Sequence, residues 1–272
     1  MKYKLIVSDF DGTLAEDDKN ISQRNISAIK SYVNRGGKFV VCTGRMSDSV
    51  VPLREIFGTQ NQSICEIGSN GSEIRDAKGN LLSSHGINPA VARRIIEKAM
   101  QMDWHVHYYD LERGYACVKE RDFIITNYEK VTGTVCKVVD LLGYIDEHPD
   151  VIIPKIMIVV AKEDMEKTVA EMEKDEYEGT IHTLSTANFL EYLPDSAGKG
   201  RALSWLANYY GIDLSETIAI GDNLNDMSMI ETAGLGVAVA SGREQLIAIA
   251  DYVAPSNNES AVADVIEKFC GE

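Results

Sequence analysis

The stretch VSDFDGTLAE, residues 7–16, ends an apolar run with two aspartates that lie two positions apart, Asp9 and Asp11, and follows them with Gly12. The run before them, YKLIVSD, has the apolar and β-branched character of a buried strand. Polar residues at the end of a buried strand recur at two further places along the chain. We therefore read the remainder of the sequence outward from this strand.

In the first and last parts of the chain, short β-branched runs alternate with segments of helical period, which is typical of a parallel sheet covered by helices on both faces. The first part predicts strands at 3–9, 38–42 and 63–69 and helices at 21–34 and 47–57, with Ser22 as the first helix's N-cap and a turn at Asn70-Gly71. The last part resumes the same alternation, with helices at 199–210, 224–233, 243–250 and up to Phe269 and strands at 216–220, 235–240 and 251–254.

The middle of the chain, from about residue 84 to 193, has a different pattern. A helix over 89–102 precedes the alternating runs WHVHYYD and RGYACVKE, which predict a hairpin. A strand at 155–161, a helix at 163–174 and strands at 180–185 and 188–193 follow. We expect an α/β protein with a Rossmann-like parallel-sheet core, residues 1–83 and 194–272, and an inserted α+β cap domain, residues 84–193.

Three predicted strands of the core end in polar sets, DFDGT, TGR and GDNLND. Because ligands bind at the carboxyl ends of the strands in open parallel sheets, these sets are expected to meet at one edge. Three carboxylates there, on Asp9, Asp11 and Asp222, would repel one another unless a hard divalent cation neutralised them. The sequence therefore predicts a Mg²⁺ site.

Each polar set taken alone also fits a purely structural role, as a turn or a helix cap. The functional interpretation depends on the occurrence of all three polar sets in one chain. All three follow a predicted strand, and Lys199 opens a helix shortly before the last of them.

With these residues placed, the whole chain resembles the haloacid dehalogenase superfamily and, within it, the Cof-type phosphatases. DFDGTL is similar to the first motif of that family, TGR to the second, Lys199 in GKGRAL to the third and GDNLNDMSM to the fourth. SNGSEI and ADYVAPSN also resemble Cof-type segments, and the inserted middle part lies where this branch carries its larger α+β cap.

The resemblance implies a phosphatase mechanism. Asp9 would attack phosphorus and form an aspartyl-phosphate that water then hydrolyses, with Asp11 as general acid and then general base. Asp9 and Asp222 would bind Mg²⁺ through their side chains, and Asp11 through its main-chain carbonyl.

The resemblance also implies how the substrate phosphate is held. Thr43, Gly44 and Lys199 would bind its oxygens. Asn225 would contact the phosphate or its ligands, and Asp226 would orient Lys199.

Other residues stay open to two interpretations. Arg45 can bind the substrate or pair with an acid at the surface. His105 and His107 face one side of a strand, which favours a polar sheet face over a metal pair because no third ligand is near in sequence. The aromatic residues between 104 and 115 favour packing within the cap over a stacking platform.

Composition limits the partners. A net charge of −15 disfavours nucleic acid and would repel an anionic substrate unless local cations or a metal intervened. No stretch reaches membrane-spanning length, and five scattered cysteines without a CxxC pair favour a reducing cytoplasm. We expect a monomer or weak homodimer that acts on a small phosphorylated metabolite, a sugar phosphate or a phosphorylated cofactor. The alternatives are a phosphomutase or phosphotransferase on hexose phosphates and a non-catalytic phosphate-sensing module.

Overall fold

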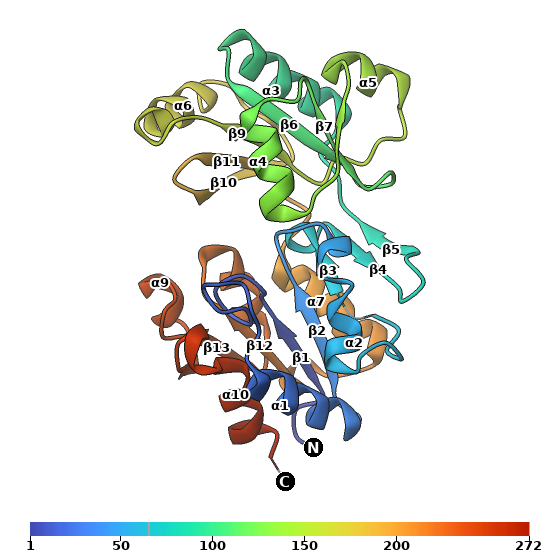
Figure 1. Cartoon of the computed structure of the whole chain (residues 1–272), viewed down its shortest axis with the longest axis vertical. Coiled ribbons are helices and arrows are strands. Elements are labelled where there is room, and N and C mark those ends of the chain that lie inside the picture. Colours follow the sequence, from blue (N-terminus) through green and yellow to red (C-terminus); the bar gives the residue numbers. More distant parts are fainter. Residues whose placement is uncertain (65, 272) are drawn as a thin grey trace. The chain divides into compact units, whose positions relative to one another are not determined.

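The computed structural model describes residues 1–64 and 66–271 and divides into two compact units (Figure 1). The first unit contains residues 1–83 and 198–272, and the second contains residues 84–197. The return to the first unit follows Ala197, whereas the sequence placed it after residue 193. Cys65, within the predicted strand at 63–69, lies outside the described residues.

The first unit is built on an eight-stranded sheet in the order β14-β13-β12-β1-β2-β3-β4-β5. Strands β14 to β3 of this order are parallel, and β4 runs antiparallel to β3. The strands are β1 (Leu5–Ser8), β2 (Lys38–Cys42), β3 (Glu66–Gly68), β4 (Glu73–Arg75), β5 (Leu81–Ser84), β12 (Thr217–Gly221), β13 (Leu235–Val239) and β14 (Tyr252–Ala254).

Both faces of this sheet are covered, as the alternation in the sequence predicted. Ile6 and Phe39 point to the face that packs on α1 and α10, whereas Leu5 and Val40 point to the face that packs on α7 and α8. The helices are α1 (Gln23–Asn34), α2 (Leu53–Phe57), α7 (Lys199–Tyr210), α8 (Met227–Thr232), α9 (Glu244–Ile247) and α10 (Ala261–Phe269). The α/β class and the parallel-sheet core are thus confirmed.

Several boundaries differ from the prediction. The predicted helix at 47–57 is a 3₁₀ turn, Ser47–Val50, followed by the short α2, and Pro52 between them has no N–H to continue one helix. The predicted helix at 243–250 is limited to the four residues of α9. Helix α1 begins as predicted, since Ser22 accepts a hydrogen bond from the Asn25 amide.

The second unit contains a six-stranded sheet in the order β10-β11-β9-β6-β7-β8. Its elements are α3 (Pro89–Gln101), β6 (His105–Asp110), β7 (Tyr115–Val118), α4 (Phe123–Thr132), β8 (Cys136–Val138), α5 (Leu141–Glu147), β9 (Ile156–Val159), α6 (Met165–Met172), β10 (Thr180–Thr186) and β11 (Phe189–Pro194). The antiparallel pair β6–β7 is the predicted hairpin, and β10 and β11, which correspond to the predicted strands at 180–185 and 188–193, also pair antiparallel.

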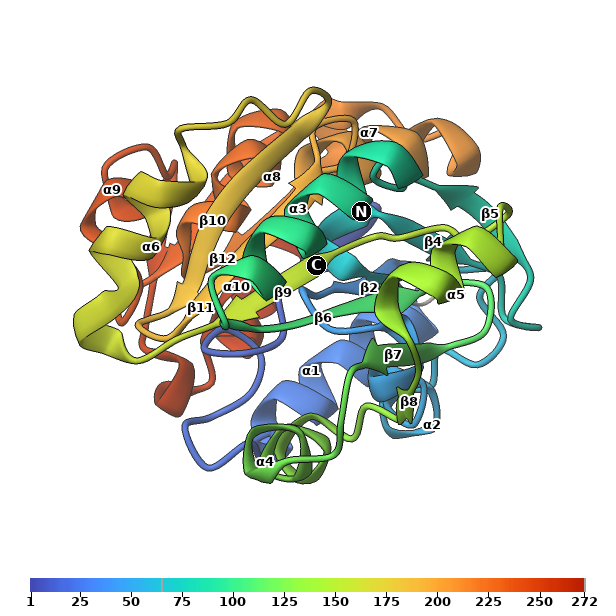
Figure 2. The ribbon, with the colours of Figure 1, turned by 90° about the horizontal axis from the view of Figure 1, so that it is seen from above.

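One face of the second sheet carries an apolar core. Tyr108, Ile156 and Leu190 point to this face and pack against α3, α5 and α6. Figure 2 shows α3 and α5 lying over its strands. The elements α4, β8 and α5 were not predicted. Strand β8 and helix α5 have three and seven residues, which is too few for the sequence to distinguish helix from strand.

Candidate active site

The polar sets at the strand ends lie side by side. Strand β1 pairs in parallel with β12 on one side and with β2 on the other. Asp9, Thr43 and Asp222 each follow the last residue of one of these three strands. Their shared direction brings them to one edge of the sheet, as expected for an open parallel sheet.

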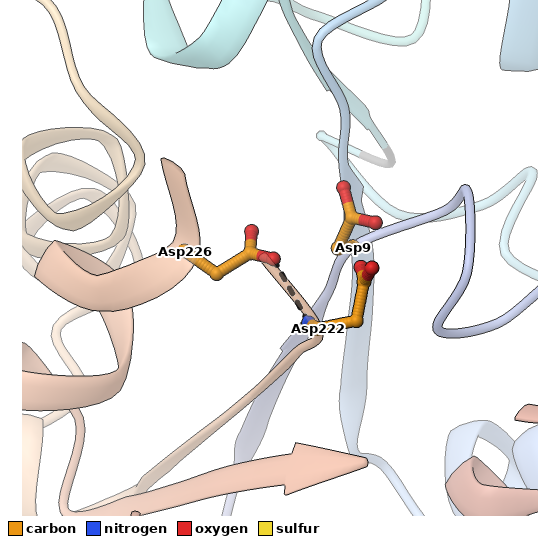
Figure 3. A group of neighbouring side chains, drawn as sticks. All are labelled: Asp9, Asp222 and Asp226. Atoms are coloured by element: carbon orange, nitrogen blue, oxygen red, sulfur yellow. Dashed lines mark hydrogen bonds between the residues drawn. The ribbon is translucent and has the colours of Figure 1, made fainter. Parts of the chain in front are cut away.

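Three carboxylates gather at this edge (Figure 3). One carboxylate oxygen from each of Asp9, Asp222 and Asp226 lies within 4.8 Å of the others. Asp9 and Asp226 are buried, and Asp222 is half-buried. The predicted ligand Asp11 does not bring its side chain into this group; the contact predicted for it was through its main-chain carbonyl.

Lys199 is the cation of the group. It is the first residue of α7, and its side chain is completely buried. Its Nζ lies 2.5 Å from Asp9 Oδ1 and 2.6 Å from Asp226 Oδ1. A buried lysine held by two buried carboxylates forms a fixed positive charge at the strand ends.

The charges of the group are unbalanced. Burial raises the pKa of Asp9 well above its usual range, and the charges of Asp226 and Asp222 raise it further against the opposing effect of Lys199. Burial and Asp226 also raise the pKa of Asp222. A further positive charge beside Asp9 and Asp222 would relieve this repulsion.

Asp226 has little capacity left for a metal ion. Its Oδ1 accepts from Lys199, and its Oδ2 accepts from the main-chain amides of Asp222 and Asn223 at 3.0 and 3.1 Å. These contacts suit a residue that fixes Lys199 and the loop after β12. Asp9 and Asp222 are therefore the side chains of this group that fit a hard divalent cation best.

The absence of a side chain at Gly12 leaves room for the carboxylate of Asp222. Its φ of +81° is in the left-handed region, and a Cβ at this position would lie 2.8 Å from Asp222 Oδ2. Thr13, the next residue, donates a hydrogen bond from Oγ1 to Asp222 Oδ1 at 3.0 Å. The loop after β1 thus positions the carboxylate that follows β12.

This arrangement predicts a specific effect of Gly12→Ala. If Asp222 is a ligand of the Mg²⁺ site that the sequence predicts, the methyl group should displace it and lower Mg²⁺ affinity by about 10- to 100-fold, the usual range for disturbing a ligand's surroundings. Gly36→Ala is the matched control, because Gly36 has a φ of +94° but nothing within 4 Å of an added Cβ. Calorimetric titration with Mg²⁺ measures both variants. Equal Mg²⁺ affinities for Gly12→Ala and Gly36→Ala would show that Asp222 does not depend on this space.

The loop after β2 approaches a second loop of the same unit. The Thr43 carbonyl accepts from the Asn70 amide at 2.9 Å, and a Cβ on Gly44 would lie 3.2 Å from Asn70 Oδ1. Asn70 Oδ1 accepts a hydrogen bond of 2.9 Å from the Nδ2 of Asn225, which is exposed. Thr43, Gly44 and Asn225 are thus brought together through Asn70, which lies in the predicted turn.

Arg45 pairs with an acid, Asp11, and its predicted contact with the substrate stays a prediction. Its Nε and one terminal nitrogen each donate at 2.7 Å to the two carboxylate oxygens of Asp11. Lys19 Nζ donates to the same carboxylate at 3.1 Å. Burial alone would raise the pKa of Asp11, but the hydrogen bonds and charges of Arg45 and Lys19 outweigh it and lower that pKa.

Sequence reasoning missed three residues of this region, Thr13, Lys19 and Asn70. Thr13 and Asn70 belong to quoted motif segments, and their positions beside Gly12 and in the turn after β3 were the available signals. Lys19 had no signal, because it contacts Asp11 only through the folded shape of an irregular loop.

The histidines of β6 lie on one side of the strand, as predicted. His105 Nε2 and His107 Nδ1 are 3.3 Å apart, and His105 Nδ1 is 3.2 Å from Asp122. Within residues 1–64 and 66–271, neither histidine belongs to a group of three metal-ligating side chains. Burial, together with the charges of His105 and Lys155, lowers the pKa of His107 to about 3. The contacts of the two histidines with each other and with Asp122 are compatible with the polar-face interpretation, which stays a prediction.

The chain is similar to a family of known hydrolases. The sequence profile of the haloacid dehalogenase-like hydrolases matches residues 6–266. Phosphatase YwpJ of Bacillus subtilis is 30% identical over 288 residues, covering 97% of this chain and 99% of its own. The 5-amino-6-(5-phospho-D-ribitylamino)uracil phosphatase YwtE of the same bacterium is 28% identical over 284 residues, covering 98% of each chain.

A solved structure is similar over its whole length. The crystal structure of a haloacid dehalogenase-like hydrolase from Bacteroides thetaiotaomicron has a TM-score of 0.85 and 27% identity, covering 98% of this chain and 99% of its own. Separately, no helix among the described residues combines the length and the apolar character needed to cross a membrane.

Proposed function

The chain belongs to the haloacid dehalogenase-like hydrolases and is a phosphoric monoester hydrolase of that family, and from this premise we propose that it hydrolyses a small phosphorylated metabolite with Mg²⁺ through a phosphoaspartate on Asp9. The main support for the proposal is the position of Asp9. Asp9 directly follows β1 and lies beside a buried lysine and a second carboxylate, Asp222, at the edge of the sheet where ligands bind.

Asp9 is the proposed nucleophile. Its carboxylate attacks phosphorus while the bond from phosphorus to the leaving oxygen breaks, and water later cleaves the phosphoaspartate. Lys199, 2.5 Å from Asp9, supplies positive charge where phosphoryl oxygens would lie. Asp226 holds that lysine in place.

Asp11 is the proposed acid and base. It gives a proton to the leaving oxygen in the first step and takes one from the attacking water in the second. Thr43, Gly44 and Asn225 bind phosphoryl oxygens in this proposal, which the clustering of their loops around Asn70 supports.

Asp9 and Asp222 would hold Mg²⁺ through their side chains, with the main-chain carbonyl of Asp11 as the third predicted ligand. When bound, the ion neutralises charge on the phosphate and on the carboxylates around it. The raised pKa values of Asp9 and Asp222 support a cation at this position.

Metal removal tests this part of the proposal. We expect dialysis against EDTA to abolish hydrolysis of 4-nitrophenyl phosphate and Mg²⁺ to restore it. Mg²⁺ should also raise the melting temperature of the protein, because the ion binds the folded state in preference to the unfolded chain. Full turnover by protein shown metal-free by elemental analysis would contradict the proposal.

The substrate class is a sugar phosphate or a phosphorylated cofactor. The name of the relative YwtE gives it a phosphorylated ribityl compound as substrate, which supports a polyol or sugar-like leaving group here. Measuring inorganic phosphate released from a panel of phosphorylated metabolites with Mg²⁺ tests the class. Conversion of a hexose phosphate to its isomer without phosphate release would favour a mutase instead.

The second unit, residues 84–197, is the proposed cap that selects the substrate. Its insertion after the strands of the first half supports this role, since inserted domains can open for entry and close to exclude water. We further propose a cytoplasmic enzyme, supported by the free thiols of Cys42, Cys117, Cys136 and Cys270.

Removing the cap tests whether the cap determines substrate selectivity while the core alone catalyses hydrolysis. With residues 84–197 replaced by a Gly/Ser linker, a folded core should still hydrolyse 4-nitrophenyl phosphate slowly. The ratio of kcat/KM between the best and the poorest metabolite of the panel should fall toward one, because that ratio measures differential transition-state binding. An unchanged ratio in a core shown folded by circular dichroism would place selectivity in the core loops.

A further inference from the structure

The chain segment that follows β2 is held by β3 and by the turn after it. The Thr43 amide donates to the Ile67 carbonyl at 2.9 Å, and the Thr43 carbonyl accepts from the Asn70 amide at 2.9 Å. Two residues further on, the Arg45 carbonyl accepts from the Ser69 amide at 2.7 Å. Main-chain contacts at alternate residues thus continue the pairing of β2 with β3 beyond the end of β2.

The turn that makes these contacts has a strained backbone. Ser69, Asn70 and Gly71 have φ values of +49°, +55° and +93°, a run of three residues in the left-handed region that side chains disfavour. Gly71 also packs closely on the start of the helix that carries Lys199, since a Cβ there would lie 2.6 Å from the Gly198 carbonyl oxygen. Strain of this kind persists where the surrounding structure requires one conformation, and it is common beside functional sites.

Glu73, on β4, supplies the next contact. Its Oε1 accepts a hydrogen bond of 2.7 Å from the Ser47 amide, and its Oε2 accepts from Arg75 Nε at 3.1 Å. Ser47 and Glu73 are each 1% exposed. Gly68 leaves room for this hydrogen bond, because a Cβ there would collide with Glu73 Oε1 and lie 2.5 Å from the Ser47 nitrogen. The contacts at alternate residues thus continue to Ser47, where the acceptor is a side chain.

Stability alone gives little reason for a carboxylate at residue 73. Taking a carboxylate and a guanidinium out of water is costly, and well-packed apolar residues often stabilise a fold as well as a buried ion pair does. Glu66, on the neighbouring strand β3, is also buried, and both of its oxygens accept from Arg54. Glu73 instead gives one oxygen to the main chain of the segment after β2. The contact with Ser47 therefore distinguishes these two buried glutamates.

We propose that Glu73 is a positioning residue for phosphate binding: by holding the Ser47 amide, it fixes residues 43–47 in the conformation that binds the phosphate group of the substrate. This inference rests on the proposed function, which places Thr43 and Gly44 on phosphoryl oxygens. Without the acceptor, the buried Ser47 amide loses its partner, and the segment must shift to find another. Binding of the phosphate depends on where these residues lie, and a misplacement of about 1 Å can cost about 100-fold.

Two double variants separate the hydrogen bond from the ion pair. Glu73→Gln/Arg75→Met and Glu73→Met/Arg75→Met both remove the two charges, but the glutamine retains an oxygen that can accept from Ser47. We expect the variant with methionine at both positions to raise the inhibition constant of inorganic phosphate, and KM for 4-nitrophenyl phosphate, by about tenfold, because the residues that hold the phosphate are displaced. The glutamine variant should stay within about twofold of the wild type, because its amide oxygen replaces the lost acceptor.

Gly68→Ala tests the same contact with both charges still present. Alanine accepts the backbone of Gly68, whose φ is −105°, but its methyl group would push Glu73 away from Ser47. This variant should therefore also raise the inhibition constant of phosphate by about tenfold. In each affected variant kcat should fall by less than KM rises, because loss of binding that is equal in the ground state and the transition state raises KM and leaves kcat unchanged.

Glu66→Met/Arg54→Met is the matched control, because it removes the buried ion pair of the neighbouring strand. It makes the same chemical change as Glu73→Met/Arg75→Met. The inhibition constant of phosphate should nevertheless stay within about twofold of the wild type, because a merely structural ion pair affects stability and not the placement of the phosphate.

The outcomes separate the inference from the function on which it rests. Equal inhibition constants for the two double variants at residues 73 and 75 would overturn the inference, and so would an equal rise in Glu66→Met/Arg54→Met. If Glu73→Met/Arg75→Met does not fold, a folded Gly68→Ala protein with the wild-type inhibition constant would overturn it as well. Wild-type protein that releases no phosphate from 4-nitrophenyl phosphate or from the metabolite panel with Mg²⁺ would overturn the proposed function itself.

Discussion

We expect Asp9→Asn to lower turnover of 4-nitrophenyl phosphate by about 10⁴-fold or more and to leave the protein folded, because Asp9 is the proposed nucleophile, an amide cannot attack phosphorus, and loss of a nucleophile costs at least that much in comparable hydrolases. The change keeps the shape of a buried side chain, and Lys199 retains its contact with Asp226. Steady-state kinetics at saturating Mg²⁺ measures the loss.

Asp48→Asn is the matched control for Asp9→Asn, since Asp48 is exposed and lies in the turn Ser47–Val50 after the second motif. Its turnover should stay within about twofold of the wild type, and both variants should show the circular dichroism spectrum of the wild type. An Asp9→Asn protein that is folded and keeps more than a tenth of wild-type turnover would rule out Asp9 as nucleophile.

We expect Lys199→Met to destabilise the protein by about 3–5 kcal/mol, because it leaves the carboxylates of Asp9 and Asp226 buried without their shared cation. Lys4→Met is the control. Lys4 pairs with Glu216 at 2.5 Å but is half exposed, so its loss should cost less than about 1 kcal/mol.

Urea unfolding in EDTA compares the free energies of unfolding of these variants. The double variant Lys199→Met/Asp226→Asn should recover part of the lost stability, because one of the two unpaired charges is then removed. A Lys199→Met protein as stable as Lys4→Met would show that Lys199 does not balance the buried acids.

The parallel-sheet core was predictable because each strand reads as an apolar run followed by a polar set. That pattern can be recognised in the sequence without knowledge of tertiary contacts, as β1, β2 and β12 show. The bounds of the short elements were less predictable. β4, with three residues, was not predicted, and α9, with four residues, was predicted as a longer helix at 243–250, because packing and Pro and Gly positions determine where such short elements end.

The candidate site also contains residues that were predictable from the sequence and contacts that were not. Asp9, Asp222, Asp226 and Lys199 were named from motifs and converge in the fold. The partner of Arg45 was left open by the sequence, since a long side chain can reach in several directions. The contact of Lys19 with Asp11 depends on a left-handed turn in an irregular loop, and no periodic pattern encodes such a turn.

Trapping the phosphoaspartate tests the central claim most directly. Protein turning over 4-nitrophenyl phosphate with Mg²⁺ is quenched in acid, unfolded and treated with borohydride, which reduces an acyl phosphate to an alcohol and leaves free carboxylates intact. Mass spectrometry of the peptide containing residue 9 should then show homoserine in place of Asp9, and only when substrate was present. Homoserine at another aspartate, or none at any position despite full turnover at the quench, would contradict the account.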